Sequence, residues 1–504
     1  MSSEVIVVGA GPVGLTLAIE LQLAGVQPLV LERLAEPAPQ RKSRGVGPLA
    51  FEALQRRGLG PALEACQPER QDEKKRDHGS AKNHFAWIHK IDPELQEEPD
   101  RTGRLIWQPD LERILADHVV ALGIDVRREY TVTDLVQHAG GVSITVTTPD
   151  GERRLEAAYV VGCDGGHSAI RRLAGFDFPG TPPIMTARQA QVEIVDPDKL
   201  PPSGRLEGGM LIHGPGVLGT FDFVEGPDVP RGAVTPEELQ ASVRRVAGVD
   251  VSITEVSDAL RFTDNARQAS TYRLGRVLLA GDAAHVHSPN GGQGLNLGLV
   301  DAVNLGWKLA AQVRGVAPEG LLDSYTEERH PAGAAVLANT RAQSALMRPG
   351  PHTDALRDIV SELMDIREVN QYFGRLLGGL AHRYTFPYTK PDDHQLIGHH
   401  CPDLTFTTAT TSSRLSQFTR SGRAVLLTPP HTPTLKAASA WRDRLELIEI
   451  NSIDDNRLSA LLIRPDGAIA WATTPGEPPN ELQLQTALTT WLGIPSTSRS
   501  DAIR

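Results

Sequence analysis

The sequence contains little cysteine. Its three cysteines, Cys66, Cys163 and Cys401, lie far apart, without a C-x-x-C pair or a cysteine–histidine cluster. A disulfide framework, a structural zinc site and a reactive dithiol all need cysteines at closer spacing. We therefore expect no disulfide scaffold and no metal site.

Long apolar runs and an excess of positive charge are also lacking. No apolar stretch reaches the roughly 18 residues that a membrane helix needs, and no basic segment precedes the short apolar run at the N-terminus. The formal net charge of -11 at pH 7 provides no overall field that would hold nucleic acid. We expect a cytoplasmic chain with neither membrane nor nucleic-acid partners.

The remaining composition is that of a globular protein. Hydrophobic residues make up 40% of the 504 residues, charged residues 22% and aromatic residues 5%, which argues against disorder. At roughly 100–200 residues per domain, the chain holds about three domains.

A glycine-rich motif follows the first apolar segment. The β-branched run from Val5 to Val8 leads into Gly9-Ala10-Gly11-Pro12-Val13-Gly14, then a helical pattern, a second strand and Glu32. In a G-x-G-x-x-G turn the first glycine makes the tight turn, the second admits a pyrophosphate and the third lets helix and strand pack. The helix N-terminus meets the phosphate charge, and Glu32 is placed to bind a ribose. The sequence predicts a dinucleotide site, but this motif alone leaves NAD and FAD open.

A second segment has the features of a nucleotide contact. Val277 to Ala280 form a short apolar strand that ends in Gly281-Asp282, and a glycine-containing loop over 289–294 precedes a long helical pattern. Such a turn presents backbone N–H groups to polar oxygens.

Three segments together resemble the single-component FAD-dependent aromatic hydroxylases, which share the fold of para-hydroxybenzoate hydroxylase. They are the first glycine motif with Glu32, a "DG" motif at Asp164-Gly165 that continues to Arg171, and a "GD" motif at Gly281-Asp282 with the loop that follows. The resemblance covers about residues 1–345. Segments 175–180 and 461–467 are most similar to hydroxylases of bacterial aromatic polyketides.

The resemblance implies FAD as the cofactor and assigns residues to it. Asp282 would bind the ribityl hydroxyls, Pro289 would lie over the reacting face, and backbone amides of the following residues would lie near the pyrimidine edge. The complete implied set is Gly9, Gly11, Pro12, Gly14, Glu32, Arg33, Arg44, Gln108, Asp164, Gly281, Asp282, Pro289, Gly292, Gly294, Leu295 and Asn296.

The resemblance also implies an α/β fold: a discontinuous Rossmann-type FAD-binding domain (1–180 and 263–345) with an inserted substrate-binding β-sheet domain (181–262). A helical linker (346–394) and a thioredoxin-like C-terminal domain without its dithiol (395–504) would follow. Candidate substrate contacts are Trp87, His213, Phe221 and Phe223. His213 is also a candidate base, and a hydrogen-bonded surface histidine is the alternative interpretation. The charged run 69–77 is expected to be a solvated loop, with a lid as the alternative.

The implied activity is a monooxygenase that uses FAD, O2 and NAD(P)H, with NADPH favoured, to hydroxylate a polycyclic aromatic, polyketide-type phenol through a C4a-hydroperoxyflavin. Baeyer–Villiger oxygenation of a related ketone remains an alternative, as does a non-catalytic flavin-binding scaffold. The protein is expected to be a monomer or a homodimer.

Overall fold

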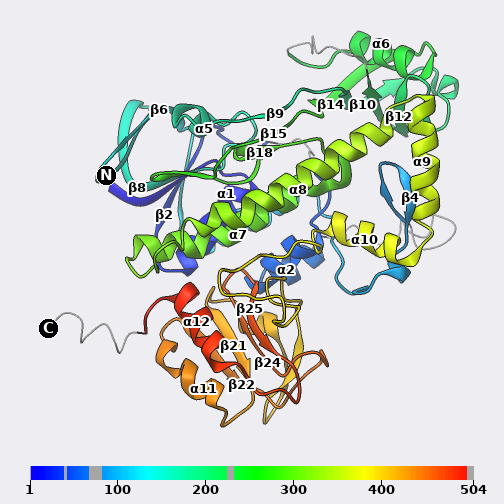
Figure 1. Cartoon of the computed structure of the whole chain (residues 1–504). Helices are drawn as coiled ribbons and strands as arrows, with labels where there is room; N and C mark the ends of the chain where they lie inside the picture. Colours follow the sequence, from blue (N-terminus) through cyan, green and yellow to red (C-terminus); the bar gives the residue numbers. More distant parts are fainter. Residues whose placement is uncertain (1, 39–42, 67–81, 224–231, 496–504) are drawn as a thin grey trace.

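The computed structural model describes residues 2–38, 43–66, 82–223 and 232–495, so the charged run 69–77 lies outside the described residues. Its elements form three parts: a central sheet with helices, an inserted sheet at one end, and a C-terminal domain at the other (Figure 1).

The central sheet has the strand order β16-β17-β8-β1-β2-β5, with β6 and β7 added beside β8. Neighbours from β17 to β5 pair in parallel. The strands are β1 (Ser2–Val8), β2 (Pro28–Glu32), β5 (Asp125–Arg128), β6 (Thr131–His138), β7 (Gly141–Thr148), β8 (Gly151–Gly162), β16 (Arg273–Leu274) and β17 (Val277–Leu279).

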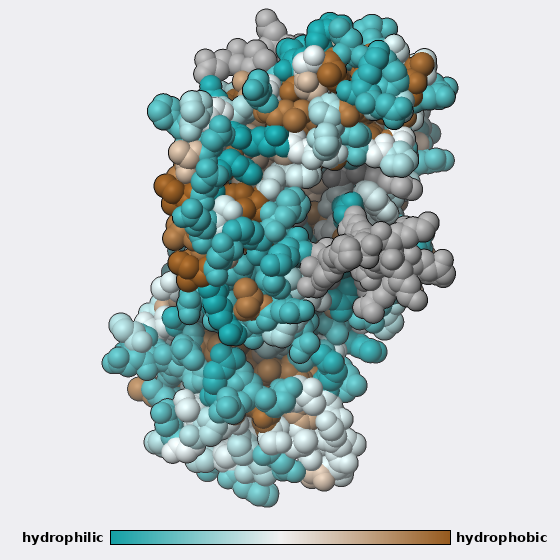
Figure 2. Space-filling model, turned by 90° about the vertical axis from the view of Figure 1, so that its right-hand side faces the viewer, coloured by the Kyte–Doolittle hydropathy of each residue, from teal (hydrophilic) through white to brown (hydrophobic). Residues whose placement is uncertain are grey.

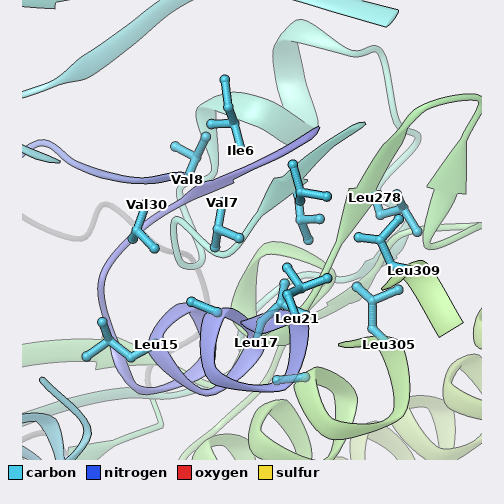
Figure 3. Close-up of a cluster of buried hydrophobic side chains, with 14 of the residues drawn as sticks. Ile6, Val7, Val8, Leu15, Leu17, Leu21, Val30, Leu278, Leu305 and Leu309 are labelled. Carbon is cyan, nitrogen blue, oxygen red and sulfur yellow. The ribbon is translucent and has the colours of Figure 1, made fainter. Parts of the chain in front are cut away.

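The core of this part lies between the sheet and its helices. Ile6 and Val7 of β1 are fully buried on opposite faces of the sheet, and Val7 points toward Leu17 of α1 (Figure 3). An uninterrupted apolar strand suits a parallel sheet that is covered on both faces. The helices are α1 (Pro12–Leu23), α2 (Pro48–Arg56), α3 (Gly60–Ala65), α4 (Gln108–Ala121), α5 (Ala169–Leu173), α7 (Gln293–Val313) and α8 (Ser324–Met347).

The inserted sheet has the order β11-β12-β13-β10-β14, and α6 packs on one of its faces. It joins the central part through the small sheet β18-β15-β9. The elements are β9 (Gly180–Thr181), β10 (Thr186–Ile194), β11 (Gly204–Leu206), β12 (Gly209–Gly214), β13 (Val217–Asp222), α6 (Pro236–Ala247), β14 (Ile253–Thr263), β15 (Ala266–Gln268) and β18 (His285–Val286).

A small hairpin and two helices lie between the inserted sheet and the C-terminal domain (Figure 1). The segment expected as a helical linker forms α9 and α10, and both pack against the hairpin. The two helices therefore hold the hairpin from this segment. These elements are β3 (Asn83–Phe85), β4 (Ile88–Ile91), α9 (Pro351–Leu363) and α10 (Arg367–Gly378).

The C-terminal domain contains a sheet of order β22-β21-β24-β25. β21 pairs in parallel with β22 and antiparallel with β24, and α11 packs beside α12. The domain shares its core with Trp307 of α7. Its elements are β19 (Thr405–Thr407), β20 (Ser412–Arg414), β21 (Ala424–Thr428), α11 (Pro433–Ala438), β22 (Leu445–Glu449), β23 (Ser452–Ile453), β24 (Ala460–Ile463), β25 (Ile469–Thr473) and α12 (Glu481–Leu492).

The molecular face in Figure 2 is mainly hydrophilic, with hydrophobic residues in separate small groups. In the described part of the chain, none of the helices combines the length and apolar character needed to cross a bilayer.

Candidate functional site

The three motif glycines occupy different surroundings at the turn between β1 and α1. A Cβ at Gly9, whose φ is +109°, would lie 2.4 Å from the Cys163 carbonyl oxygen, and a Cβ at Gly14 would lie 1.9 Å from the Gly9 carbonyl oxygen. Both contacts are closer than side chains tolerate. A Cβ at Gly11 would meet nothing within 4 Å, so this glycine faces open space in which a pyrophosphate could approach the backbone.

In the described part of the chain, no side chain caps the N-terminus of α1. The first turn of this helix has no acidic residue, and Pro12 lies at its start. The free N–H groups and the helix dipole can therefore meet a phosphate. Glu32 accepts hydrogen bonds from the backbone N–H groups of Ala10 (2.8 Å) and Leu34 (2.9 Å). It is half-buried at the end of β2, and Arg33 beside it is exposed.

The DG motif forms the turn between β8 and α5. One carboxylate oxygen of Asp164 accepts the N–H groups of Ala169 (2.6 Å) and Ile170 (3.2 Å). The other oxygen is buried without a partner among the described residues, which leaves an acceptor for a hydroxyl donor. Arg171 donates to the carbonyls of Gly166 and Ala283 (2.8 and 2.9 Å). This arginine therefore joins the DG turn to the GD turn.

The GD motif follows β17 and places a carboxylate near the start of α7. Gly281 has a φ of +63°, which favours glycine, and its N–H donates to Asp301 (3.1 Å). The Asp282 side chain is exposed, and a Cβ at Gly294 would lie 4.0 Å from its carboxylate.

The N-terminus of α7 is the second exposed set of backbone donors. Gly292 is its N-cap residue in the left-handed region, no side chain of the described residues caps it, and the first turn has no acid. The amides of Gly294 and Leu295 therefore have no partner within the helix. The Asn296 side chain bonds the Gly47 N–H (2.6 Å) and the Gly292 carbonyl (2.9 Å). Asn296 thus fixes this loop against α2.

Arg44 and Gln108 lie on two segments that pair with each other. The Arg44 carbonyl accepts the Ile106 N–H (3.2 Å), and the Ser43 carbonyl accepts the Gln108 N–H (2.9 Å). The Gln108 side chain donates to Glu112 (2.8 Å). Only Arg44 of the two lines the cavity described next.

A cavity of about 640 Å³ lies between the α7 loop, the inserted sheet and α10. Its lining brings together Arg44, Pro289 and Gly292 with two of the candidate substrate contacts, Trp87 and Phe221. Phe223 packs in the apolar cluster that also contains Trp87 and Phe221. The predicted flavin side and the predicted substrate side therefore meet at one cavity.

His213 lies on the other face of the inserted sheet. Along β12, Met210 packs in the cluster with Phe221, while Leu211 packs against α6. Alternate side chains of a strand point to the same face, so His213 lies on the face of β12 that carries Leu211. Its ring nitrogen contacts the Pro201 carbonyl (2.8 Å) and its N–H donates to Ser203 (2.9 Å). These are the hydrogen bonds of the alternative interpretation, and His213 does not line the cavity.

Trp87 reaches the cavity from a strained turn between β3 and β4. Ala86 and Trp87 have φ values of +49° and +64°, which is unfavourable for residues with side chains. Gln343 of α8 accepts the Ala86 N–H (3.2 Å), and Arg357 of α9 donates to the Ala86 carbonyl (2.7 Å). The two helices therefore hold this turn at the cavity.

Several cavity residues carry no motif and escape sequence reasoning. His84 stacks on Trp87 with ring centroids 5.2 Å apart. Burial, with a smaller contribution from His89, lowers the pKa of His84 to about 4, so its imidazole is neutral at pH 7. Gln96, Arg375 and Leu377 complete the wall opposite the inserted sheet. The local sequence gives no signal that would place these residues together.

A buried chain of polar groups supports the GD turn from behind. Asp301 on α7 contacts His285 (2.7 Å) and accepts from Arg329 of α8 (2.8 Å). Arg329 also donates to the Tyr384 hydroxyl (3.0 Å). Since Asp301 also accepts the Gly281 N–H, this chain fixes the turn that carries Asp282.

Comparison with known proteins identifies the same family that the sequence motifs resemble. The family model described as "FAD binding domain" matches residues 2–340, and the model "Aromatic-ring hydroxylase, C-terminal" matches residues 394–495. A 12-dehydrotetracycline 5-monooxygenase/anhydrotetracycline 6-monooxygenase of Streptomyces rimosus subsp. rimosus is 40% identical, with 98% of this chain and 100% of the relative covered. A dialkyldecalin synthase of Streptomyces rugosporus is 38% identical, over 98% of this chain and 99% of the relative.

The structure of anhydrotetracycline hydroxylase from Streptomyces rimosus matches with a TM-score of 0.87 and 40% identity, over 98% of this chain and 100% of that one. Together with the glycine turn, the DG and GD motifs and the α/β architecture, these matches identify the chain as a member of the FAD-dependent aromatic-ring hydroxylase family.

Proposed function

We propose that the protein hydroxylates a polycyclic aromatic phenol of the polyketide type, using FAD, O2 and NADPH. The observation that carries this proposal is the cavity of about 640 Å³, in which aromatic side chains face Pro289 and Gly292 beside the N-terminus of α7. A cavity of this size and lining suits a flat, fused-ring molecule.

The residues on the cofactor side fit FAD. Gly11 leaves space for the pyrophosphate, Asp164 has an unpartnered buried oxygen, and the first turn of α7 presents free amides. FAD, when bound, supplies the activation of O2 after reduction by the nicotinamide. The α7 amides would stabilise negative charge on the reduced ring.

The described residues on the substrate side of the cavity orient the substrate and do not include a strong base. Trp87, Phe221 and Phe262 offer aromatic faces that align a planar ring, and exclusion of bulk water protects a reactive intermediate. We propose that His84, neutral at pH 7, hydrogen-bonds a phenolic hydroxyl from beside Trp87. Holding the ring in place would then supply most of the rate increase.

A second candidate function rests on one relative. The dialkyldecalin synthase of Streptomyces rugosporus bears the name of a synthase and not of an oxygenase, which favours a flavin-retaining protein without oxygen transfer as the alternative. Baeyer–Villiger oxygenation of a ketone uses the same cofactor and would give a lactone instead of a phenol.

The deciding experiment is NADPH oxidation by the FAD-loaded protein, with and without a panel of tricyclic and tetracyclic phenols. We expect aromatic ligands to stimulate NADPH oxidation and to yield a phenol that contains one additional oxygen. A lactone product would indicate the Baeyer–Villiger reaction. Bound FAD with neither stimulation nor product across the panel would favour the synthase-like alternative. NADH in parallel assays tests the proposed preference for NADPH, and sedimentation velocity tests the proposed monomer or homodimer.

A further inference from the structure

A second cavity of about 650 Å³ adjoins the candidate substrate cavity. It lies between α10, the segment 97–101 and the C-terminal domain, which contributes Asp455, Arg457 and Ile469. Its lining differs from that of the first cavity, because charged and imidazole side chains replace the aromatic faces.

Five residues line both cavities and form the partition between them: Glu97, Glu98, Arg101, Arg375 and Leu380. Arg101 is a fixed part of this partition. It binds both carboxylate oxygens of Glu52 (2.7 and 2.8 Å) and also contacts Glu98 (3.2 Å), and its side chain is only 11% exposed. Such a buried, multiply bonded guanidinium is held in one geometry.

Arg375 is the weakly paired part of the partition. It meets Glu97 through a single contact of 3.3 Å, with 40% and 54% of the two side chains exposed. An ion pair as exposed as this one contributes little to stability. Arg375 can therefore exchange Glu97 for another anionic partner with little loss of stability.

Arg383 supplies a second guanidinium at the far side of the partition. It donates to the Ile397 carbonyl (2.7 Å) and, among the described residues, pairs with no carboxylate. His399 also lines this cavity, and burial, followed by the charges of Arg383 and Arg375, lowers the pKa of its ring. Arg457 is neutralised by Asp455 (2.6 Å), so Arg375 and Arg383 are the cations available to a ligand.

We propose that the active site has two compartments and that the polar one binds an anionic end of the substrate, a carboxylate or an ionised enol, between Arg375 and Arg383. The aromatic rings occupy the first cavity, while the anion replaces Glu97 at Arg375. This inference rests on the proposed function, and it gives the C-terminal domain a role in choosing the substrate.

Two matched probes test the proposal by binding alone, through the change they cause in the absorbance of the protein-bound oxidised FAD. The probes are 1,8-dihydroxyanthraquinone and its 3-carboxylate. We expect Arg375→Ala and Arg383→Ala each to weaken binding of the carboxylate probe at least about threefold, and the double variant about tenfold. The affinity for the parent quinone should change less than about twofold. Glu97→Gln should strengthen binding of the carboxylate probe, since it frees Arg375 and removes a repulsive charge.

Arg414→Ala is the matched control, because Arg414 is also an exposed arginine that pairs with one carboxylate, Asp403 (2.8 Å), and it lines neither cavity. Equal effects on both probes, or no effect on either, would overturn the polar compartment. Weaker NADPH binding with unchanged carboxylate binding would also overturn it, because the anion would then be a nucleotide phosphate. If neither probe perturbs the flavin of the wild-type protein, the proposed function fails and this inference with it.

Discussion

At the scale of single residues, the glycines of the first motif separate folding from cofactor binding. Gly9 and Gly14 are required by the protein itself, because a Cβ at either position would collide with backbone oxygens. A Cβ at Gly11 would meet none of the described atoms within 4 Å. We therefore expect a side chain at this position to disturb a bound group and not the fold.

We predict that Gly11→Val weakens FAD binding at least about tenfold while the Tm of the apoprotein changes little, since the new side chain fills only the space of the pyrophosphate. Gly14→Ala should instead destabilise the apoprotein. FAD titration and thermal unfolding of both variants check this, with Gly214→Ala as control, because its Cβ also meets nothing. Unchanged FAD affinity in Gly11→Val would contradict the placement of the cofactor.

Substitutions at Trp87 and His213 test which face of the inserted sheet meets the substrate. Trp87 lines the cavity together with Phe221 of that sheet, and His213 lies on the other face. Trp87→Ala should weaken binding of a polycyclic phenol about tenfold, since a stacked aromatic pair contributes about 0.5–1.5 kcal/mol beyond its buried area. His213→Ala should leave binding unchanged, because His213 bonds Pro201 away from the cavity. Titration of the ligand against the oxidised flavin spectrum measures both. A larger loss from His213→Ala would reverse our assignment of the faces.

At the scale of elements, the first β–α–β unit could be predicted from sequence and the wall of the cavity could not. Local sequence patterns in residues 5–32 are sufficient to predict this unit: an apolar strand, glycines at the turn, and a helix that ends at Leu23. The roles of α9 and α10 depend on distant partners. Asn370, for example, donates to the Lys90 carbonyl (2.7 Å), 280 positions away in sequence, and no local pattern encodes such a contact.

The candidate site divides in the same way. The candidate cofactor residues belong to short motifs, so the sequence could point to Gly9, Asp164 and Asp282. Substrate residues come from separate elements with ordinary side chains. Alternation along β12 cannot tell which face of the sheet meets the cavity, so the sequence leaves both interpretations of His213 open.

The chain of polar groups behind the GD turn makes the stability of the fold depend on pH in the acid range. Burial alone would raise the pKa of Asp301, but the charges of Arg329 and His285 and their hydrogen bonds hold the pKa below its ordinary value. A carboxyl with a lowered folded-state pKa stabilises the fold above its unfolded-state pKa and loses that contribution as the pH falls through the folded-state value. The contribution is therefore complete near neutral pH.

We predict that Asp301→Asn lowers the free energy of unfolding at pH 7 by about 3–5 kcal/mol, because Arg329 is left buried without its counter-charge. The difference from wild type should shrink as the pH falls below about 4. Denaturant unfolding at several pH values measures it. A difference that stays constant with pH would show that the ionised carboxylate is not what stabilises the turn.

At the scale of the whole molecule, buried charges connect the C-terminal domain to the FAD-binding domain. Arg464 binds both oxygens of Glu328 on α8 (2.7 Å each) and the Asp466 carboxylate (3.1 Å). Lys308 of α7 also donates to Glu328 (2.9 Å). Burial raises the pKa of Glu328, but Arg464 and Lys308 lower it to about 2, so this carboxylate is ionised throughout the usual pH range.

Replacing Arg464 should therefore weaken the attachment of the C-terminal domain to the FAD-binding domain. We predict that Arg464→Met lowers the free energy of unfolding by about 3–5 kcal/mol, since two buried carboxylates lose their shared partner. Arg153→Met is the control, because its pair with Asp150 is at least half exposed on both sides and should contribute less than about 1 kcal/mol. Urea unfolding measures both. A change in Arg464→Met no larger than in the control would mean that these charges do not hold the domains together.

The central claim is that this molecule transfers oxygen to a polycyclic phenol in the cavity beside α7. The most direct measurement is turnover of the FAD-loaded protein with NADPH under ¹⁸O2, with a panel of polycyclic phenols and mass spectrometry of the products. We predict a hydroxylated product that carries one ¹⁸O atom, formed together with ligand-stimulated NADPH oxidation. A protein that retains no FAD, or a product oxygen that comes from water, would contradict it.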